Sequence, residues 1–371
     1  MSQIDPNGLM EFSVVFTDRS LNHMSKAFQG VMTDISTMLK DVYQADHVAL
    51  VPGGGTYGME AVARQFGSDA HAMIIRNGWF SYRWTQIFDA GDFTAKTTVM
   101  KARQAGNDTR APFAPAPIED VVAAIRDAKP DVVFAPHVET SAGIILPDDY
   151  IAAMAVAAHE VGALMVLDCI ASGCIWIDMK ALGVDVLISA PQKGWSATPS
   201  AGLVMMSDRA VDRMADTQSN SFALDLKKWH SIMQAYENGG HAYHATMPTD
   251  GLRAFRDTML ETREYGFDKL KVTQQTLGDE VRAYLAGKGI KSVAADGFAA
   301  PGVVVSYTDD VAIQNGSKFS ALGMQIAAGV LLQCDEPDDF RTFRLGLFGL
   351  DKLYDVPATM ARLTGVLDQV L

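Results

Sequence analysis

Short runs of apolar residues recur along this chain, and several of them are followed by a segment whose apolar residues have helical spacing. The runs lie at residues 48–51, 72–75, 131–135, 163–167, 184–189 and 202–207. They are continuous rather than alternating, so we expect both faces of the sheet that they form to be covered. The pattern predicts an α/β fold with a mainly parallel central sheet sandwiched by helices.

The length of 371 residues predicts more than one domain. We expect an N-terminal segment (1–20), a large domain (21–250), and a long linking helix followed by a small α+β C-terminal domain (251–371). The linking helix is expected from Gly251 to about Gly287, where apolar residues follow a helical period. The proline-rich residues 111–117 are interpreted as a local linker.

Composition excludes several classes of protein. The net charge of −13 argues against nucleic acid or an anionic membrane as a partner. Three cysteines without a C-x-x-C spacing predict neither a disulfide framework nor a metal site, and favour the reducing cytoplasm. The longest apolar region, 150–177, is interrupted by His159, Glu160 and Asp168, so no membrane span is expected. The N-terminus does not resemble a secretory signal.

Four polar groups follow predicted strands. They are P-G-G-G-T (52–56), H-V-E-T-S-A-G (137–143), D-C-I-A-S (168–172) and A-P-Q-K-G (190–194). Open parallel sheets bind ligands beyond the carboxyl ends of their strands. We therefore expect these groups to line one cleft.

The glycine-rich group is typical of a phosphate-binding turn, because glycines let the backbone approach a phosphate at the start of a helix. Gly53, Gly55 and Gly58 also satisfy the dinucleotide pattern G-x-G-x-x-G. A dinucleotide site usually has an acid after the next strand, whereas this chain has Arg76 and Asn77 there. A strand-to-helix turn without a ligand is the other interpretation.

Asp168 and Lys193 are the two residues whose spacing favours a specific cofactor. A strand-end Asp is often only a helix cap and a loop Lys is usually solvated, but their joint placement is how proteins hold pyridoxal phosphate. The amine forms a Schiff base with the aldehyde, and the carboxylate keeps the pyridine nitrogen protonated. A partly desolvated, cationic site lowers the pKa of the lysine, which then moves a proton at the substrate Cα.

Two further groups have a functional and a structural interpretation. An aromatic residue in 76–84 could stack on a flat ring, although such clusters more often belong to a core or interface. His137 and Glu139 could act in acid–base chemistry, whereas a lone histidine is more often structural.

Taken together, the chain resembles class V aminotransferases, a family of fold-type I pyridoxal-phosphate enzymes, and within it the alanine–glyoxylate and serine–glyoxylate group. The stretches that carry the resemblance are P-G-G-G-T-Y-G-M-E, N-G-W-F-S-Y-R, H-V-E-T-S-A-G-I, D-C-I-A-S-G, S-A-P-Q-K, Y-H-A-T-M-P and F-R-L-G-L-F-G. The resemblance extends from about Leu21 to the C-terminus. It implies a ping-pong transfer of an amino group from alanine, serine or aspartate to glyoxylate or another small 2-oxo acid.

The resemblance also implies a role for each matching residue. The catalytic residues would be Lys193 and Asp168. The cofactor ring would lie between Ile170 and Phe80, with Ser141 as a further contact and Gly55, Thr56 and Gln192 at the phosphate. Tyr243 and Thr246 would reach the phosphate of a neighbouring subunit, which implies a homodimer with shared active sites. Arg344 would bind the substrate carboxylate, although an arginine there could also form a surface ion pair.

Other functions remain open at this point. The same fold carries lyases, cysteine desulfurases and 2-aminoethylphosphonate transaminases, and a desulfurase needs a reactive cysteine. Cys334 lies next to acids, which disfavours that role. A nicotinamide dehydrogenase or a binding protein without activity would leave the Asp168–Lys193 pair unexplained. The N-terminal segment and Met24 depart from the family pattern, which leaves the amino donor undetermined.

Overall fold

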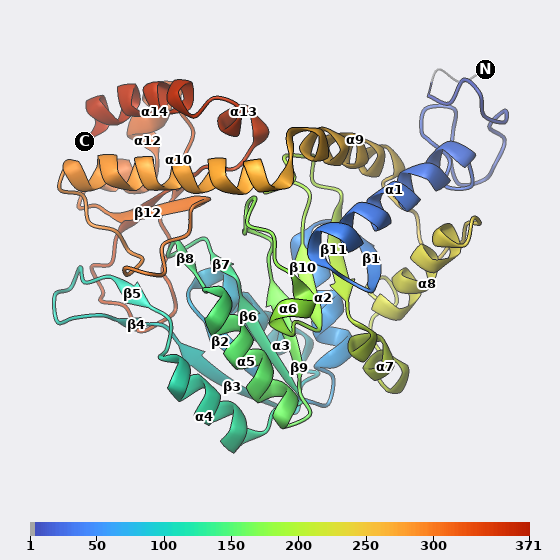
Figure 1. Ribbon diagram of the computed structural model, residues 1–371, viewed down its shortest axis with the longest axis horizontal. Coiled ribbons are helices and arrows are strands. Elements are labelled where there is room, and N and C mark those ends of the chain that lie inside the picture. Colours follow the sequence, from blue (N-terminus) through green and yellow to red (C-terminus); the bar gives the residue numbers. More distant parts are fainter. Residues whose placement is uncertain (1–3) are drawn as a thin grey trace.

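The computed structural model describes residues 4–371, with a central sheet flanked by helices and a second, smaller sheet beside it (Figure 1). The central strands, in spatial order, are β1 (His47–Pro52), β11 (Ala201–Met206), β10 (Val186–Ser189), β9 (Leu164–Asp168), β6 (Val132–Pro136), β2 (His71–Arg76) and β3 (Lys96–Lys101). Strands β6, β9, β10 and β11 are buried along their whole length. Continuous apolar strands therefore form the middle of the sheet, as the sequence predicted.

One strand of the central sheet runs against the others. Strands β10, β9, β6, β2 and β3 pair in parallel, but β11 is antiparallel to both β10 and β1. The chain passes from β10 to β11 through residues 190–200 without a crossover helix, and a parallel neighbour would need such a crossover. The run at 202–207, expected among the parallel strands, is thus the antiparallel exception.

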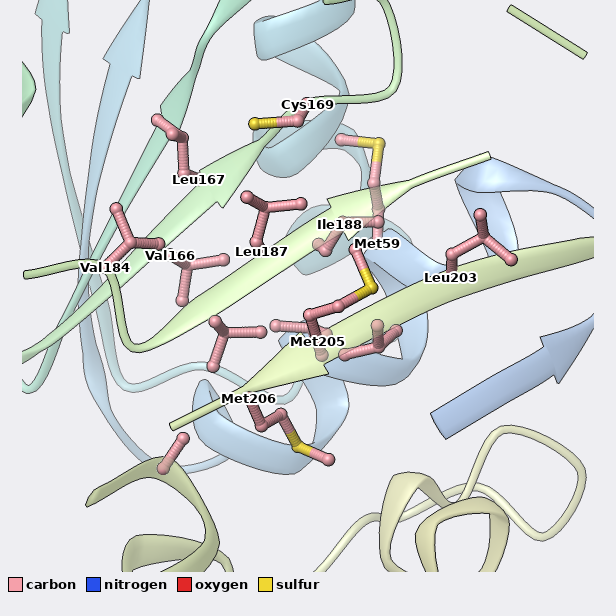
Figure 2. Packing of buried hydrophobic residues seen from close by; sticks show 14 of the residues in the cluster. Met59, Val166, Leu167, Cys169, Val184, Leu187, Ile188, Leu203, Met205 and Met206 are labelled. Atoms are coloured by element: carbon pink, nitrogen blue, oxygen red, sulfur yellow. The ribbon is translucent and has the colours of Figure 1, made fainter. Parts of the chain in front are cut away.

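Helices cover the sheet and position its loops. They are α1 (Lys26–Tyr43), α2 (Gly55–Phe66), α3 (Trp79–Gly91), α4 (Ile118–Ala128), α5 (Asp148–Glu160), α6 (Met179–Leu182), α7 (Asp208–Asp216) and α8 (Leu226–Glu237). Helix α2 contacts β10 and β11, α3 contacts β2, and α5 contacts β9. Figure 2 shows Met59 of α2 packed beside Ile188 and Met205 of these strands.

The contact between α2 and β11 requires glycine on both elements. A Cβ built on Gly202 would lie 2.6 Å from the Cα of Gly58, and one built on Gly58 would lie 3.2 Å from Gly202 Cα. The glycine at 58, which completes the G-x-G-x-x-G pattern, therefore serves close packing of helix on strand. This packing places the N-terminus of α2 at the edge of the sheet where β9 and β10 end.

The C-terminal part has its own sheet and apolar core. Its elements are α9 (Thr249–Tyr265), α10 (Phe267–Gly287), β12 (Val303–Tyr307), α11 (Val311–Gln314), α12 (Ser317–Ala321), β13 (Ala327–Ala328), β14 (Thr342–Gly346), α13 (Leu350–Leu353) and α14 (Val356–Val370). The strand order is β12-β14-β13. Buried residues such as Leu277 of α10, Phe343 of β14 and Leu367 of α14 belong to one cluster. The domain boundaries given above stay a prediction.

Two local predictions differ from the structure. The helical stretch from Gly251 to Gly287 is broken into α9 and α10 at Gly266, whose φ of 103° is open to glycine but strained for other residues. The proline-rich residues 111–117 contain a short strand, β5 (Phe113–Ala114), paired with β4 (Arg103–Gln104). A second short ribbon, β7 (Val138–Glu139) with β8 (Ile144–Ile145), follows β6.

No helix within residues 4–371 is both long and apolar enough to span a membrane.

Candidate active site

Asp168 and Lys193 lie beyond adjacent strands of the central sheet. Asp168 is the last residue of β9, and Lys193 lies in the turn that follows β10. The two strands are parallel neighbours, with Ile188 of β10 opposite Asp168, and β6 places Pro136 opposite Asp168 on its other side. Parallel strands present their carboxyl ends at one edge. The fold thus brings the two predicted catalytic residues to the same edge.

The carboxyl group of Asp168 is held in a buried position. The residue is 6% exposed, and its Oδ1 accepts a hydrogen bond from the backbone N–H of Ile170 at 2.9 Å. Burial raises the pKa of Asp168 to about 7, whereas the Ile170 N–H and the positive charges of Arg83 and Lys193 act in the opposite direction. A protonated ring nitrogen placed against this carboxyl group would favour its ionised form.

Burial also changes the chemistry of Lys193. Burial lowers the pKa of the Lys193 amine, nearby Arg344 lowers it further, and the charge of Asp168 opposes the shift. The amine lies 5.4 Å from the centre of the Phe348 ring. A lowered pKa increases the fraction of neutral amine, which is the form that attacks an aldehyde.

The glycine-rich turn forms a cradle at the start of α2. Gly54 is the N-cap residue of this helix and has no side chain with which to cap it. A Cβ built on Gly55 would lie 2.5 Å from Cδ1 of Ile170, so a larger residue there would force this side chain to move. Thr56 is exposed beside them. The turn therefore presents backbone N–H groups and a hydroxyl at a helix N-terminus, an arrangement suited to a phosphate.

A buried carboxylate organises the start of α3, which carries Phe80. Glu139 is fully buried and accepts hydrogen bonds from the backbone N–H groups of Phe80 (3.2 Å) and Ser81 (2.9 Å). The hydroxyl of Ser141 donates to Glu139 at 2.7 Å and accepts from the backbone N–H of Trp79 at 2.9 Å. Glu139 therefore caps α3, with a favourable interaction with the helix dipole. Ser141 belongs to this network, and its contact with a cofactor stays a prediction.

Two arginines approach Phe80, and only one of them was predicted. The Cζ atoms of Arg344 and Arg83 lie 5.5 Å and 5.1 Å from the centre of the Phe80 ring. Arg344 comes from β14, where its Nε donates to the carbonyl of Ala328 at 2.8 Å, and burial lowers its pKa. Arg83 was missed, although its position three residues after Phe80 on a helix indicates a shared face.

The remaining predicted ligands lie at the surface of the chain. Tyr243 is 54% exposed, its hydroxyl lies 3.2 Å from that of Thr246, and its ring is 5.5 Å from the ring of His23. Within residues 4–371, these contacts do not join either residue to Asp168 or Lys193. Gln192 is exposed next to Lys193. The roles of these three residues at the cofactor phosphate stay predictions.

The family model described as aminotransferase class-V matches residues 11–297 of the chain. The protein belongs to this family. The membership predicted from the sequence motifs is therefore confirmed, and the matched region contains Asp168, Lys193 and the glycine-rich turn.

Relatives of this class V aminotransferase have diverse names. The small subunit of a soluble hydrogenase from Synechococcus sp. (strain PCC 6716) is 25% identical over 353 residues, which is 94% of this chain and 88% of the relative. A 2-aminoethylphosphonate–pyruvate transaminase from Vibrio parahaemolyticus is 25% identical, covering 87% and 83%. The crystal structure of an alanine–glyoxylate aminotransferase from Nostoc sp. has a TM-score of 0.78 at 21% identity, covering 95% and 89%. The predicted fold is thus confirmed.

The side chains of this aminotransferase fit the cofactor that the family implies. The buried carboxyl group of Asp168 is matched to a pyridine nitrogen, and the amine of Lys193 to an aldehyde. A Cβ built on Gly54, the N-cap of α2, would meet nothing within 4 Å, so there is open space for a phosphate beside the start of this helix. Asp168, Lys193, Ile170 and the glycine-rich turn would therefore hold pyridoxal phosphate.

Burial of Cys334 and of His137 argues against a desulfurase and against acid–base chemistry by this histidine. Burial, with smaller effects from Glu139 and Glu336, raises the pKa of Cys334 to about 12, so its thiol is poorly suited to the nucleophilic role in a desulfurase. His137 is buried with Nδ1 2.7 Å from the hydroxyl of Ser172, and burial lowers its pKa to about 3. A neutral, hydrogen-bonded imidazole fits the structural interpretation of this histidine.

Proposed function

We propose that this class V aminotransferase uses pyridoxal 5′-phosphate to move an amino group from a small amino acid to glyoxylate or another small 2-oxo acid. The observation that carries the proposal is that the buried Asp168, at the end of β9, and the half-buried Lys193, in the turn after β10, lie at one edge of the sheet. A dehydrogenase or a protein without activity would not need a buried carboxyl group and a lysine of lowered pKa at the same edge of the sheet.

When bound, the cofactor supplies an electron-withdrawing ring that stabilises negative charge at the substrate Cα. Asp168 would keep the ring nitrogen protonated, because the burial that raises the pKa of this carboxyl group also strengthens its pairing with a cation. Lys193 would bind the aldehyde and, once displaced by the substrate amine, would take the proton from Cα and return it on the cofactor side. Its depressed pKa suits this role as a base.

Arg344 would bind the substrate carboxylate beside Lys193. Its charge contributes to the lowered pKa of Lys193, and its guanidinium lies 5.5 Å from the centre of the Phe80 ring. A single guanidinium in this position suits donors with one carboxylate at the reacting carbon, such as alanine, serine or aspartate. A second candidate donor is 2-aminoethylphosphonate, which the name of the Vibrio relative suggests, and whose anionic group could bind the same guanidinium.

The test is a half-reaction with no acceptor present. We expect each candidate donor that is a substrate to yield about one oxo product per subunit, because the amino group stays on the bound cofactor. Liquid chromatography measures the product, and glyoxylate or pyruvate added afterwards should be converted to its amino acid. The absence of any stoichiometric product with alanine, serine, aspartate and 2-aminoethylphosphonate would contradict the proposal.

We further propose a homodimer in which Tyr243 and Thr246 complete the phosphate site of the partner subunit. Their exposure, and the absence within residues 4–371 of a hydrogen bond or ring contact from either residue to Asp168 or Lys193, support this assignment. The three cysteines are free and buried, in keeping with the proposed cytoplasmic location.

Subunit mixing tests the shared site. We expect Lys193→Ala and the double variant Tyr243→Phe/Thr246→Ala to be strongly impaired alone and to regain about one quarter of parental activity when mixed. Random pairing makes half of the dimers mixed, and each mixed dimer then has one intact site of two. Activity is measured after the subunits are denatured together and refolded. Recovery no greater than the sum of the two separate variants would contradict a shared site.

A further inference from the structure

Arg83 is a charged residue of the candidate active site to which the proposed function gives no role. It lies on α3, one turn after Phe80, and its Cζ is 5.1 Å from the centre of the Phe80 ring. Its Nη1 donates a hydrogen bond to Oγ1 of Thr56 at 2.9 Å. Arg83 thus joins the helix that carries the predicted stacking residue to the glycine-rich turn.

The position of this guanidinium is fixed by two elements that are themselves held in place. Helix α3 is anchored at its start by the buried carboxylate of Glu139. Helix α2, which carries Thr56, is anchored by the close approach of Gly58 and Gly202. The positive charge of Arg83 lowers the pKa of Asp168 and of Lys193. In each case this effect is smaller than that of burial. The guanidinium therefore lies between the Phe80 ring and the Thr56 hydroxyl at the candidate active site.

A phosphate bound by Thr56 would meet this guanidinium. An anion that accepts a hydrogen bond from the Thr56 hydroxyl must lie within a few ångströms of Arg83, because the two side chains are in contact. The N-terminus of α2 adds positive partial charge at the same place. A guanidinium offers several donors in one plane and binds a phosphate dianion through two hydrogen bonds at once.

We propose that Arg83 is a ligand of the cofactor's phosphate, acting with Thr56 and the first N–H groups of α2. The assignment rests on the proposed function, since it concerns the phosphomonoester of pyridoxal phosphate. In this arrangement Arg83 exchanges its hydrogen bond with Thr56 for hydrogen bonds with the phosphate oxygens, and Arg344 alone serves the substrate.

The experiment compares two ligands that differ only in the phosphate. Pyridoxal 5′-phosphate and pyridoxal are titrated into the protein freed of cofactor, and binding is followed by absorbance and tryptophan fluorescence. We expect Arg83→Gln to raise the Kd for pyridoxal phosphate about 10- to 100-fold, the loss expected for charge-assisted hydrogen bonds, and to leave the Kd for pyridoxal unchanged. Arg83→Lys keeps the positive charge but loses the paired N–H donors of the guanidinium, so the Kd for pyridoxal phosphate should increase less.

Arg64→Gln serves as the matched control. Arg64 lies in the last turn of α2, at the end away from Thr56, and pairs with Glu60, so this variant should bind both ligands as the parental protein does. An equal loss for both ligands in Arg83→Gln would overturn the assignment, because the residue would then act through Asp168 or the ring. Unchanged Kd values with a raised KM for the amino donor would assign Arg83 to the substrate instead. A parental protein that binds neither ligand would refute the proposed function itself.

Discussion

Replacing Lys193 with alanine should reduce the rate of transamination at least about a thousandfold, because the variant loses both the covalent attachment and the base that moves the proton at Cα. The measurement is kcat with the best donor from the half-reaction screen. A second measurement is independent of turnover: after reduction with borohydride, the parental subunit should gain the mass of the cofactor less one water and plus two hydrogens, and the variant should not.

Lys180→Ala provides the control for this variant. Lys180 is an exposed lysine of α6, the helix that precedes β10, whereas Lys193 follows this strand, and Lys180 pairs with Asp46 at 2.8 Å. We expect it to retain parental kcat and to be labelled by reduction. Transamination at the parental rate by Lys193→Ala, or equal labelling of both variants, would remove the basis for the proposed chemistry.

Replacing Asp168 with asparagine should reduce kcat about 100- to 1000-fold, a loss comparable to removal of one electrostatic group from an active site. Asparagine has nearly the same shape as the carboxyl group and can still accept the hydrogen bond from Ile170. It lacks the negative charge that would keep a ring nitrogen protonated. Asp178→Asn, which changes an N-cap residue of α6 to another good N-cap, is the matched control.

The parental protein and Asp168→Asn should also differ in how their stability depends on pH when no cofactor is bound. Burial raises the pKa of Asp168 to about 7 from the usual 3.8, so between these values the folded protein keeps a proton that the unfolded chain releases. The free energy of unfolding should therefore fall as pH rises through this window, by about 1.4 kcal/mol per pH unit from this group. Asp168→Asn lacks this contribution.

Urea denaturation between about pH 5.5 and pH 7 measures the difference, since the linear extrapolation gives the free energy of unfolding at each pH. The stability of Asp168→Asn relative to the parental protein should increase steadily over this range, and that of Asp178→Asn should not. A relative stability that is flat or decreases with pH would show that the carboxyl group titrates normally and is not desolvated.

The sequence was most informative where a function depends on short motifs at strand ends. Asp168 and Lys193 could be predicted to meet because parallel strands end at one edge, and that geometry follows from the order of the apolar runs. Arg344 could be predicted only through the family motif, because its approach to Phe80 depends on how the C-terminal sheet lies against the rest. Nothing local in F-R-L-G-L-F-G specifies that contact.

The features that the sequence did not reveal depend on packing between elements. Arg83 reaches Thr56 only because α2 and α3 lie side by side over the sheet, and this distance cannot be read from either helix alone. Glu139 was considered for acid–base chemistry, but its five hydrogen bonds to α3 and to Ser141 assign its carboxylate to helix capping. The direction of β11 also escaped prediction, since an apolar run is compatible with either orientation.

The reversed direction of β11 has a consequence for the reactive amine. Because β10 and β11 are hydrogen-bonded neighbours, the segment 190–200 that carries Lys193 is fastened at both ends, and its Ala197 N–H is bonded to the carbonyl of Pro191. A short segment held at both ends has few backbone conformations left to lose when a ligand binds. The backbone that carries this amine is therefore already ordered in the folded protein, so substrate binding does not have to order it.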